Sequence, residues 1–149
     1  MILLDTNVVS EPMRPNPDRR VLAWLDAQVT ESLYLSTVSF AELLLGIESL
    51  PVGKRRKTLA TTLHKQVIAL FGERIVPFDL SAAETYAQIV TRARRHGHPI
   101  AVADAQIAAI AASRQFAVAT RDETPFQAAG VSVINPWTAS IEDRFGDPD

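Results

Sequence analysis

The sequence contains no cysteine and only three histidines among its 149 residues. The absence of cysteine excludes a disulfide framework and any thiolate metal site. Zinc sites usually require more histidine or cysteine than this chain offers. Any metal site in this protein must therefore be built mainly from oxygen ligands.

Long apolar runs are also missing. The longest purely apolar stretch covers residues 107–112, far short of the roughly 20 residues that span a bilayer. The N-terminus reaches Asp5 after only three apolar residues and has no basic segment, so a signal peptide is not expected. We therefore expect a soluble, cytoplasmic protein without a membrane segment.

A strong excess of positive charge is absent as well, because the net charge is -2. This balance argues against a nucleic-acid binder that works by electrostatic attraction alone. The basic residues nevertheless form three clusters, at Arg19–Arg20, Lys54–Lys57 and Arg92–Arg95. These clusters are either solvated helix faces or phosphate contacts around an acidic centre.

Length and composition favour one domain over residues 1–149, with a core of its own and a frayed tail over residues 144–149. Short apolar segments predict five strands, over residues 2–5, 33–36, 75–78, 117–120 and 131–134. The segments between these predicted strands have the residue spacing of helices. This alternation predicts an α/β sandwich around a mainly parallel sheet.

Cap residues and breaks in the pattern set the expected helices. We expect the first helix to open at Pro17 and bury Val21, Leu22 and Leu25, and a later one to open with a Ser81–Glu84 capping box. The other predicted helices are residues 38–50, a helix that presents Leu59, Leu63, Val67 and Leu70, and residues 100–115. Residues 38–71 are expected to form an antiparallel helix pair.

Two acids, Asp5 and Asp122, follow predicted strands directly. In a parallel sheet, ligands bind beyond the carboxyl ends of the strands, so both positions suit a functional site. An ordinary role is also available to Asp5, because a strand-to-helix turn often uses aspartate as a helix cap.

Two further acids, Glu42 and Asp104, lie inside predicted helices with apolar neighbours. Glu42 follows Ser39 by three residues, so a capping box is an alternative explanation for it. Asp104 has no basic residue three or four positions away, and an unpaired buried carboxylate is costly. We therefore expect Asp104 to be protonated, paired from elsewhere in the fold, or bound to a cation.

A cluster of carboxylates would repel itself by roughly 4 kcal/mol per pair at a separation of about 4 Å. Oxygen-only ligands suit the hard cations Mg²⁺ and Mn²⁺. Such a cation can orient and activate water for attack on a phosphodiester. No GxxxxGK[ST] or GxGxxG motif is present, so nucleotide-binding α/β proteins find no support.

The four acids lie in segments that resemble the PIN-domain ribonucleases, in particular VapC-type toxins and their FitB-like branch. The resemblance covers nearly the whole chain. Its segments are Ile2–Asn7, Ser39–Leu43, Ile100–Ala109 and Ala119–Asp122, joined by Asn135-Pro136-Trp137 near the end. Each segment is short, but their order and spacing are specific.

The resemblance implies a three-layer α/β/α sandwich that gathers Asp5, Glu42, Asp104 and Asp122 around Mg²⁺ or Mn²⁺ to cleave RNA. It gives Asn7 and Thr120 supporting roles beside these acids, although a strand-end hydrogen bond would also explain Thr120. It further implies a homodimer and a cognate antitoxin that contacts DNA in place of the toxin. We expect Trp137 to be a packing anchor, and the three histidines to serve surface or capping roles.

The leading hypothesis is thus a metal-dependent endoribonuclease that acts as the toxin of a type II toxin-antitoxin system. The alternative is a partner-bound regulatory module whose acids hold a cation, or a partner's arginine, with little hydrolysis. A metal-dependent phosphatase or DNA nuclease that uses the same acids is a third possibility. These readings differ in whether the purified protein cleaves RNA.

Overall fold

The fold is built on one parallel sheet, seen in a computed structural model that describes residues 1–139. Its strand order is β3-β2-β1-β4-β5. The strands are β1 (Ile2–Leu4), β2 (Leu33–Ser36), β3 (Ile75–Val76), β4 (Ala117–Ala119) and β5 (Val133–Ile134). The predicted α/β class with a mainly parallel sheet is confirmed.

Four strands are shorter than the sequence predicted, β1 and β4 by one residue each, and β3 and β5 by two residues each for local reasons. β3 ends at Val76 because Pro77 has no backbone N–H to donate to the ladder. Val131 donates its backbone N–H to the carbonyl of Phe126, 3.2 Å away, and so closes the preceding helix before β5 begins. The expected strand residues 77–78 and 131–132 therefore belong to connections.

Helices fill the connections between the strands. They are α1 (Thr6–Ser10), α2 (Arg19–Asp26), α3 (Thr37–Glu48), α4 (Lys54–Phe71), α5 (Leu80–Arg95), α6 (Val102–Arg114) and α7 (Glu123–Ala128), with 3₁₀ turns at residues 11–13, 30–32 and 72–74. The short helices α1 and α7 were not among the predicted helices. None of the helices within residues 1–139 is long and apolar enough to cross a membrane.

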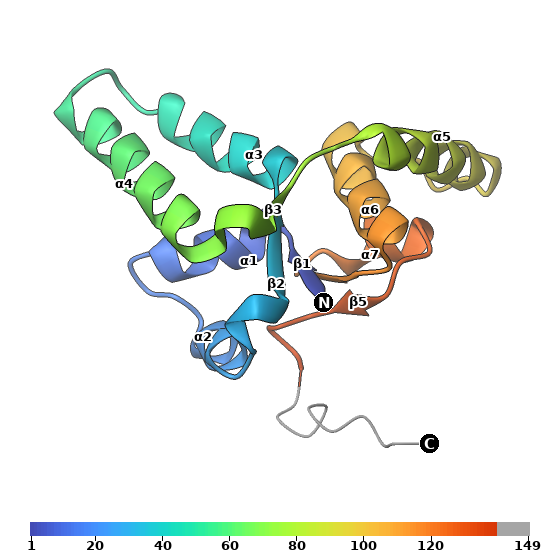
Figure 1. Cartoon of the computed structure of the whole chain (residues 1–149), viewed down its shortest axis with the longest axis horizontal. Coiled ribbons are helices and arrows are strands. Elements are labelled where there is room, and N and C mark those ends of the chain that lie inside the picture. The colour runs from blue at the N-terminus through green and yellow to red at the C-terminus, as the bar shows by residue number, and fades with distance from the viewer. Residues whose placement is uncertain (140–149) are drawn as a thin grey trace.

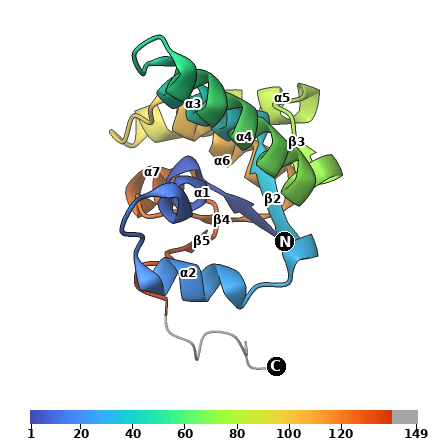
Figure 2. The same cartoon turned by 90° about the vertical axis from the view of Figure 1, so that its left-hand side faces the viewer.

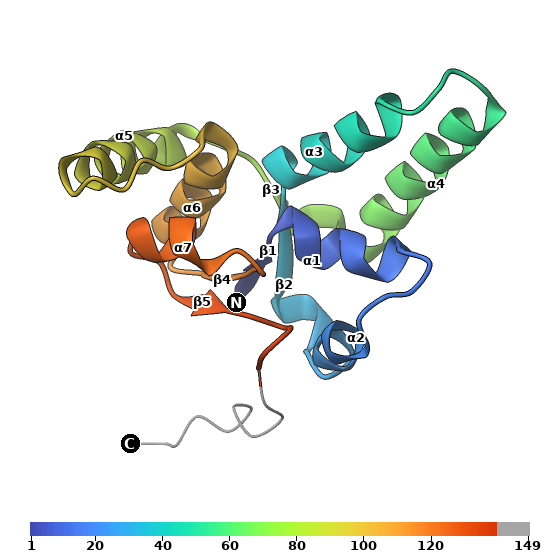
Figure 3. The ribbon, with the colours of Figure 1, turned by 180° about the vertical axis from the view of Figure 1, so that it is seen from behind.

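The sheet separates two layers of helices (Figure 1). Leu3 packs into a cluster with residues of α5, α6 and α7, whereas its neighbour Leu4 packs into a second cluster with residues of α1 to α4. Successive side chains of a strand point to opposite faces, so each strand serves both layers. Figures 2 and 3 show the α3–α4 pair extending beyond the sheet. The three-layer sandwich is thus confirmed.

Three helix starts differ from those predicted, and in α2 and α5 the reason is a better cap nearby. α2 begins at Arg19, since the side chain of Asp18 accepts the backbone N–H of Arg20 at 2.9 Å. α5 begins at Leu80, because Asp79 accepts the N–H of Ala82 at 2.9 Å in place of the expected Ser81 cap. α6 begins only at Val102, after an extended Ala101.

The buried faces of α2 and α4 also differ from the prediction in part. In α2, Val21 is fully buried and its leucines are half-buried. In α4, Leu63 and Val67 are buried together with Phe71, whereas Leu59 and Leu70 are 38% and 55% exposed. The inward stripe of α4 is therefore Leu63–Val67–Phe71, one turn later along the helix than expected.

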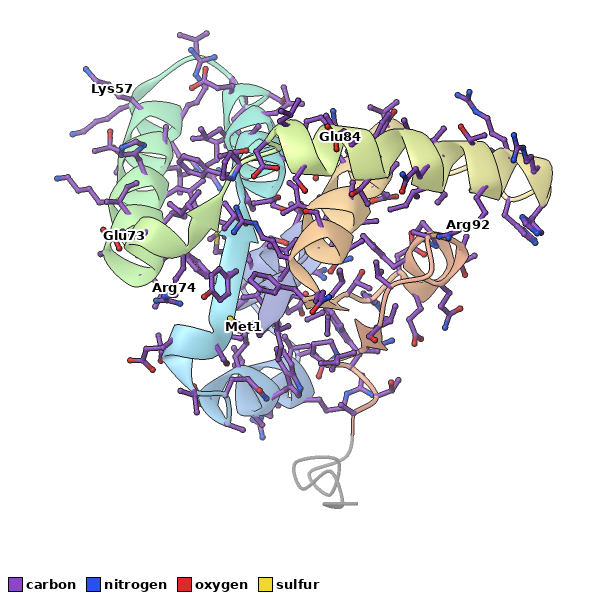
Figure 4. The ribbon with its side chains drawn as sticks, turned by 45° about the vertical axis from the view of Figure 1, so that its right-hand side comes forward. Met1, Lys57, Glu73, Arg74, Glu84 and Arg92 are labelled. Atoms are coloured by element: carbon purple, nitrogen blue, oxygen red, sulfur yellow. The ribbon has the colours of Figure 1, made fainter. Side chains whose placement is uncertain are left out.

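The side chains of Trp137 and Arg92 have packing roles. Trp137 is 5% exposed within the α1–α4 cluster, so its predicted role as a packing anchor is confirmed. Arg92 reaches from α5 to the end of α7 and donates to the carbonyl of Ala129 at 2.7 Å (Figure 4). The predicted frayed tail, residues 144–149, lies outside the described residues.

Candidate active site

The sheet has a switch point beside β1. The chain moves from β1 outward to β2 and β3, then returns to pair β4 on the other side of β1. At such a switch point the connections diverge and leave a crevice beyond the carboxyl ends of the strands. Asp5 follows β1 and Thr120 follows β4, so both residues stand at this crevice.

The carboxylate of Asp5 is only 6% exposed and is held at both oxygens. Oδ1 accepts the backbone N–H of Thr6 at 2.8 Å, which makes Asp5 the N-cap of α1, and Oδ2 accepts the hydroxyl of Thr120 at 2.8 Å. Burial raises the pKa of Asp5 to about 6, opposed by these two hydrogen bonds and reinforced by the charges of Asp104 and Glu42. Asp5 therefore caps α1 and also belongs to a group of acids that affect one another's pKa.

Thr120 is fully buried and connects two of the acids. Its hydroxyl donates to Asp5 and accepts the backbone N–H of Asp122 at 3.0 Å. The same side chain thus fixes the orientation of one carboxylate and the backbone position of the other. Thr120 thus makes the strand-end hydrogen bond that was the alternative explanation for it. The same bond also places Thr120 beside the acids.

Glu42 lies in the second turn of α3 and is exposed, although its neighbours along the helix are mostly apolar. The cap of α3 is Ser36, whose hydroxyl accepts the N–H of Ser39 at 3.0 Å, so Glu42 takes no part in a capping box. Instead, Oε1 of Glu42 accepts the hydroxyl of Thr6 at 2.8 Å. This bond directs the carboxylate toward the start of α1.

Asp104 lies in the first turn of α6 and is half-buried. Its pKa is raised above the ordinary value, first by burial and then by the charges of Asp122 and Glu42. A carboxylate in the first turn also faces the positive end of the helix dipole, which favours its charged form. The prediction that no local base pairs with Asp104 agrees with the causes of this shift, which include no positive charge.

Asp122 is exposed at the start of α7, and its side chain does not cap that helix. Its carboxylate therefore remains available for another ligand. The adjoining backbone is held by Asn7, whose Oδ1 accepts the N–H of Arg121 at 3.4 Å, a long hydrogen bond. All six residues proposed from the sequence thus occupy the carboxyl edge of the sheet or the helices beside it.

Comparison with known proteins identifies the family of the chain. The PIN-domain family model matches residues 2–131. The chain belongs to the PIN-domain family. The chain is 49% identical to the VapC ribonuclease Y4jK of Sinorhizobium fredii, over 92% of this chain and 98% of that protein. It is 51% identical to toxin FitB of Neisseria gonorrhoeae, over 92% of this chain and 99% of that protein.

A solved structure is equally similar to this PIN domain. The crystal structure of FitAcB from Neisseria gonorrhoeae contains a chain that superposes with a TM-score of 0.89. The identity is 50%, and the match covers 93% of this chain and 100% of that chain. The relatives therefore correspond to this protein over nearly their full lengths and belong to the VapC and FitB branch that the sequence resembled.

Sequence reasoning missed two polar residues of this PIN domain. Thr6 lies inside the first motif, but only the fold brings its hydroxyl to Glu42. Ser39 is fully buried, and its hydroxyl is the one buried side-chain polar atom within residues 1–139 that has no hydrogen-bond partner. No periodicity identifies either residue. The only sequence signal for Thr6 and Ser39 was that both lie within the segments that resemble the PIN-domain family.

The four acids influence one another without forming a closed cage. The raised pKa values of Asp5 and Asp104 both include repulsion from Glu42, so the carboxylates lie within electrostatic reach. Within residues 1–139, however, no three acidic or histidine side chains gather tightly enough to enclose an ion as they stand. Among the histidines, His64 stacks near Phe40 and His96 contacts the carbonyl of Arg92.

The donor set fits a hard divalent cation in its chemistry. Carboxylate oxygens are the ligands that Mg²⁺ and Mn²⁺ prefer, and Mg²⁺ commonly retains several waters, so a closed cage of protein ligands is not required. A cation at this edge would also offset the repulsion that raises the pKa of Asp104. The site therefore has the right charge and the right ligand atoms for such an ion.

Proposed function

We propose that this PIN domain is a metal-dependent endoribonuclease and acts as the toxin of a type II toxin-antitoxin system. The observation that carries the proposal is the convergence of four carboxylates from separate segments at the switch point of a parallel sheet. Asp5 and Asp104 have raised pKa values in which the other acids take part. A relative that is 49% identical to this chain over 98% of its own length is named a VapC ribonuclease.

In this proposal Asp5, Glu42, Asp104 and Asp122 hold Mg²⁺ or Mn²⁺. A bound divalent cation would orient and acidify a water molecule and offset charge on the phosphodiester. Thr120 keeps Asp5 oriented through the bond to Oδ2, and Thr6 does the same for Glu42. The remaining supporting residue, Asn7, holds the backbone between Thr120 and Asp122.

We also propose that the protein forms a homodimer in the cytoplasm and binds a cognate antitoxin, which contacts DNA in place of the toxin. Support comes from a relative named toxin FitB and from the similarity to a chain of the FitAcB crystal structure. Each covers more than nine-tenths of this chain. Copurification with the product of a neighbouring small reading frame tests this part of the proposal.

RNA cleavage by the purified protein tests the catalytic proposal directly. We expect cleavage of single-stranded RNA with Mg²⁺ or Mn²⁺, and none with a chelator. Asp104→Asn removes one ligand charge and should lower the rate by about 100-fold, the upper range for the loss of groups that support a metal site. The matched control is Glu73→Gln, which neutralises an exposed acid just before β3 at the opposite edge of the sheet.

The control should retain its full rate and thermal stability. Equal rates for Asp104→Asn and the unsubstituted protein would refute the assignment of the acids. A second candidate function is the regulatory binding module, which the open spacing of the acids favours. That candidate predicts stabilisation by the cation in the complete absence of RNA cleavage, so the same preparations decide between the two.

A further inference from the structure

Arg121 lies between the two polar residues that follow β4, Thr120 and Asp122, and its side chain is exposed. The guanidinium Cζ lies 5.3 Å from the centroid of the Trp137 ring. At this distance a guanidinium is attracted to the face of the indole. The guanidinium of Arg121 is thus held over the Trp137 ring, and Arg121 itself lies directly between Thr120 and Asp122 in the chain.

The support for Arg121 is itself fixed at several points. Trp137 is 5% exposed, and its backbone N–H donates to Oδ1 of Asn135 at 2.9 Å. The Asn135 amide in turn donates to Glu123 of α7 at 3.2 Å. The other end of Arg121 is held by Asn7 through the backbone. A rigid ring under the guanidinium lowers the entropy that a long side chain loses on binding a ligand.

Arg121 also differs from the neighbouring arginine in its charge partners. Arg20 donates twice to Asp18, at 3.1 and 2.7 Å, which uses its positive charge locally. Within residues 1–139, no acid lies within ion-pair distance of Arg121, although Asp122 follows it directly in the chain. Its charge does reach Asp18, whose pKa is lowered to about 2 chiefly by the hydrogen bonds from Arg20 and to a lesser degree by Arg121.

The other basic clusters are less well placed. Arg94 and Arg95 end α5, where cations complement the helix dipole, and Arg92 is bonded to Ala129. Lys54–Lys57 lies at the outer end of α4, shown by Lys57 in Figure 4. Arg121 is the basic residue adjacent in sequence to the proposed acids, where the negative charge would otherwise repel an RNA backbone.

We propose that Arg121 binds a phosphate of the RNA strand beside the acidic site, and that Trp137 is the residue that positions its guanidinium. This inference rests on the proposed ribonuclease function. A guanidinium held over an aromatic ring keeps N–H donors free, and these can reach two oxygens of one phosphate. The contact would be independent of base sequence, because it involves only the backbone.

RNA binding without cleavage isolates this contact. The experiment uses a fluorescently labelled single-stranded RNA in the presence of a chelator and follows anisotropy over a range of salt concentrations. We expect Arg121→Ala to weaken binding about tenfold near 0.1 M salt and to reduce the slope of log K against log salt by about 0.7, as for one lost phosphate contact on a single strand. Arg121→Lys should keep the slope while binding more weakly.

The matched control is Arg114→Ala. Arg114 ends α6, ten residues after Asp104, and pairs with Asp79 at 3.6 Å, so the same loss of charge occurs away from the site. This control should bind RNA with unchanged affinity and slope. An Arg121→Ala protein that matches the unsubstituted protein in both quantities overturns the inference, as does failure of the unsubstituted protein to bind RNA.

The role of Trp137 needs its own variants, because its removal can also disturb packing. We expect Trp137→Leu to lose the same salt slope as Arg121→Ala, whereas Trp137→Phe, which retains a ring, should recover most of it. A purely structural role would change the melting temperature without altering the slope in the folded protein. Arg121-dependent binding in a protein that cleaves no RNA would refute only the ribonuclease proposal, so the two failures are distinguishable.

Discussion

At the residue scale, Asp5 of this PIN domain suits a functional site when it is charged, but its charge lowers the stability of the fold. Its carboxylate is buried at the switch point, so ionisation costs free energy even though Thr6 and Thr120 donate hydrogen bonds to it. A group with a raised acid pKa in the folded state destabilises the fold once it is charged. A ligand that binds the charged carboxylate of Asp5, such as a cation, would offset this cost at neutral pH.

The metal-free protein should lose stability as the pH rises. The pKa of Asp5 is 3.8 when unfolded and about 6 when folded. The stability that protonated Asp5 gives the fold is therefore fully present below pH 4 and is lost as the pH rises through 6. This loss lowers the free energy of unfolding by about 3 kcal/mol. Urea unfolding with a chelator, between pH 4.5 and 7.5, measures this difference against Asp5→Asn.

The Asp5→Asn protein should be the more stable of the two at pH 7.5, and the gap should narrow toward pH 4.5. Comparing the two proteins removes the contribution of other titrating groups. A constant difference across this range would show that burial does not govern the ionisation of Asp5. Glu73→Gln, which removes an exposed carboxylate, should leave the pH profile unchanged.

At the scale of elements, the helix starts depend on which cap the fold makes available. The spacing of Ser81 and Glu84 matches a capping box. Asp79, however, lies two residues before Ser81, at the end of the connection from β3 to α5. Its Oδ1 caps the N–H of Ala82 and its Oδ2 lies 3.6 Å from Arg114 of α6. Tertiary contact with α6 thus favours the earlier cap.

Two alanine substitutions should separate these caps. Asp79→Ala should lower the free energy of unfolding by about 1 kcal/mol because the first turn of α5 loses its acceptor. Ser81→Ala should change it by no more than about 0.5 kcal/mol, as expected of an exposed helical position. Denaturant unfolding measures both values, and a larger cost for Ser81→Ala would support the capping box and contradict this cap assignment.

At the scale of the whole molecule, the site is assembled from distant parts of the chain. Asp5 ends β1 and Glu42 lies on α3 in the layer that holds Leu4, whereas Asp104 lies on α6 in the layer that holds Leu3. A cation bound between them would connect both layers of the sandwich. Metal binding should therefore stabilise the complete fold.

Mg²⁺ or Mn²⁺ should raise the melting temperature of the unsubstituted protein. At an ion concentration about 100 times Kd, binding to the native state adds about 2.7 kcal/mol to the free energy of unfolding. For a chain of this size that corresponds to a shift of roughly 5 to 10 °C. Thermal unfolding in chelator and in increasing Mn²⁺ measures the shift.

Asp104→Asn should weaken this response and stabilise the metal-free protein, because one of the repelling charges is gone. Glu73→Gln should respond to the ion as the unsubstituted protein does. If Asp104→Asn neither stabilises the metal-free form nor reduces the response to Mn²⁺, then burial and repulsion from the other acids do not disfavour the charged form of Asp104 as its raised pKa implies.

The sequence by itself determined the order of the strands and of the longer helices, the mainly parallel class of the sheet and the positions of the four acids along the chain, but not the short helices α1 and α7. Apolar runs such as Ile2–Leu4 and residues at strand ends such as Asp5 are local signals, and local periodicity carries them. Burial was predicted less well. Asp5 is buried, Asp104 is half-buried, and Glu42 and Asp122 are exposed.

Only the tertiary structure decided the partners of these residues. The Thr6–Glu42 bond, the shared hydroxyl of Thr120 and the placement of Arg121 on Trp137 join residues up to 115 positions apart. Such contacts depend on strand order and on which helix covers which face, and neither is encoded by the residues near the contact. The sequence thus supplied the acids, and the crossover of the chain at β1 made one candidate site of them.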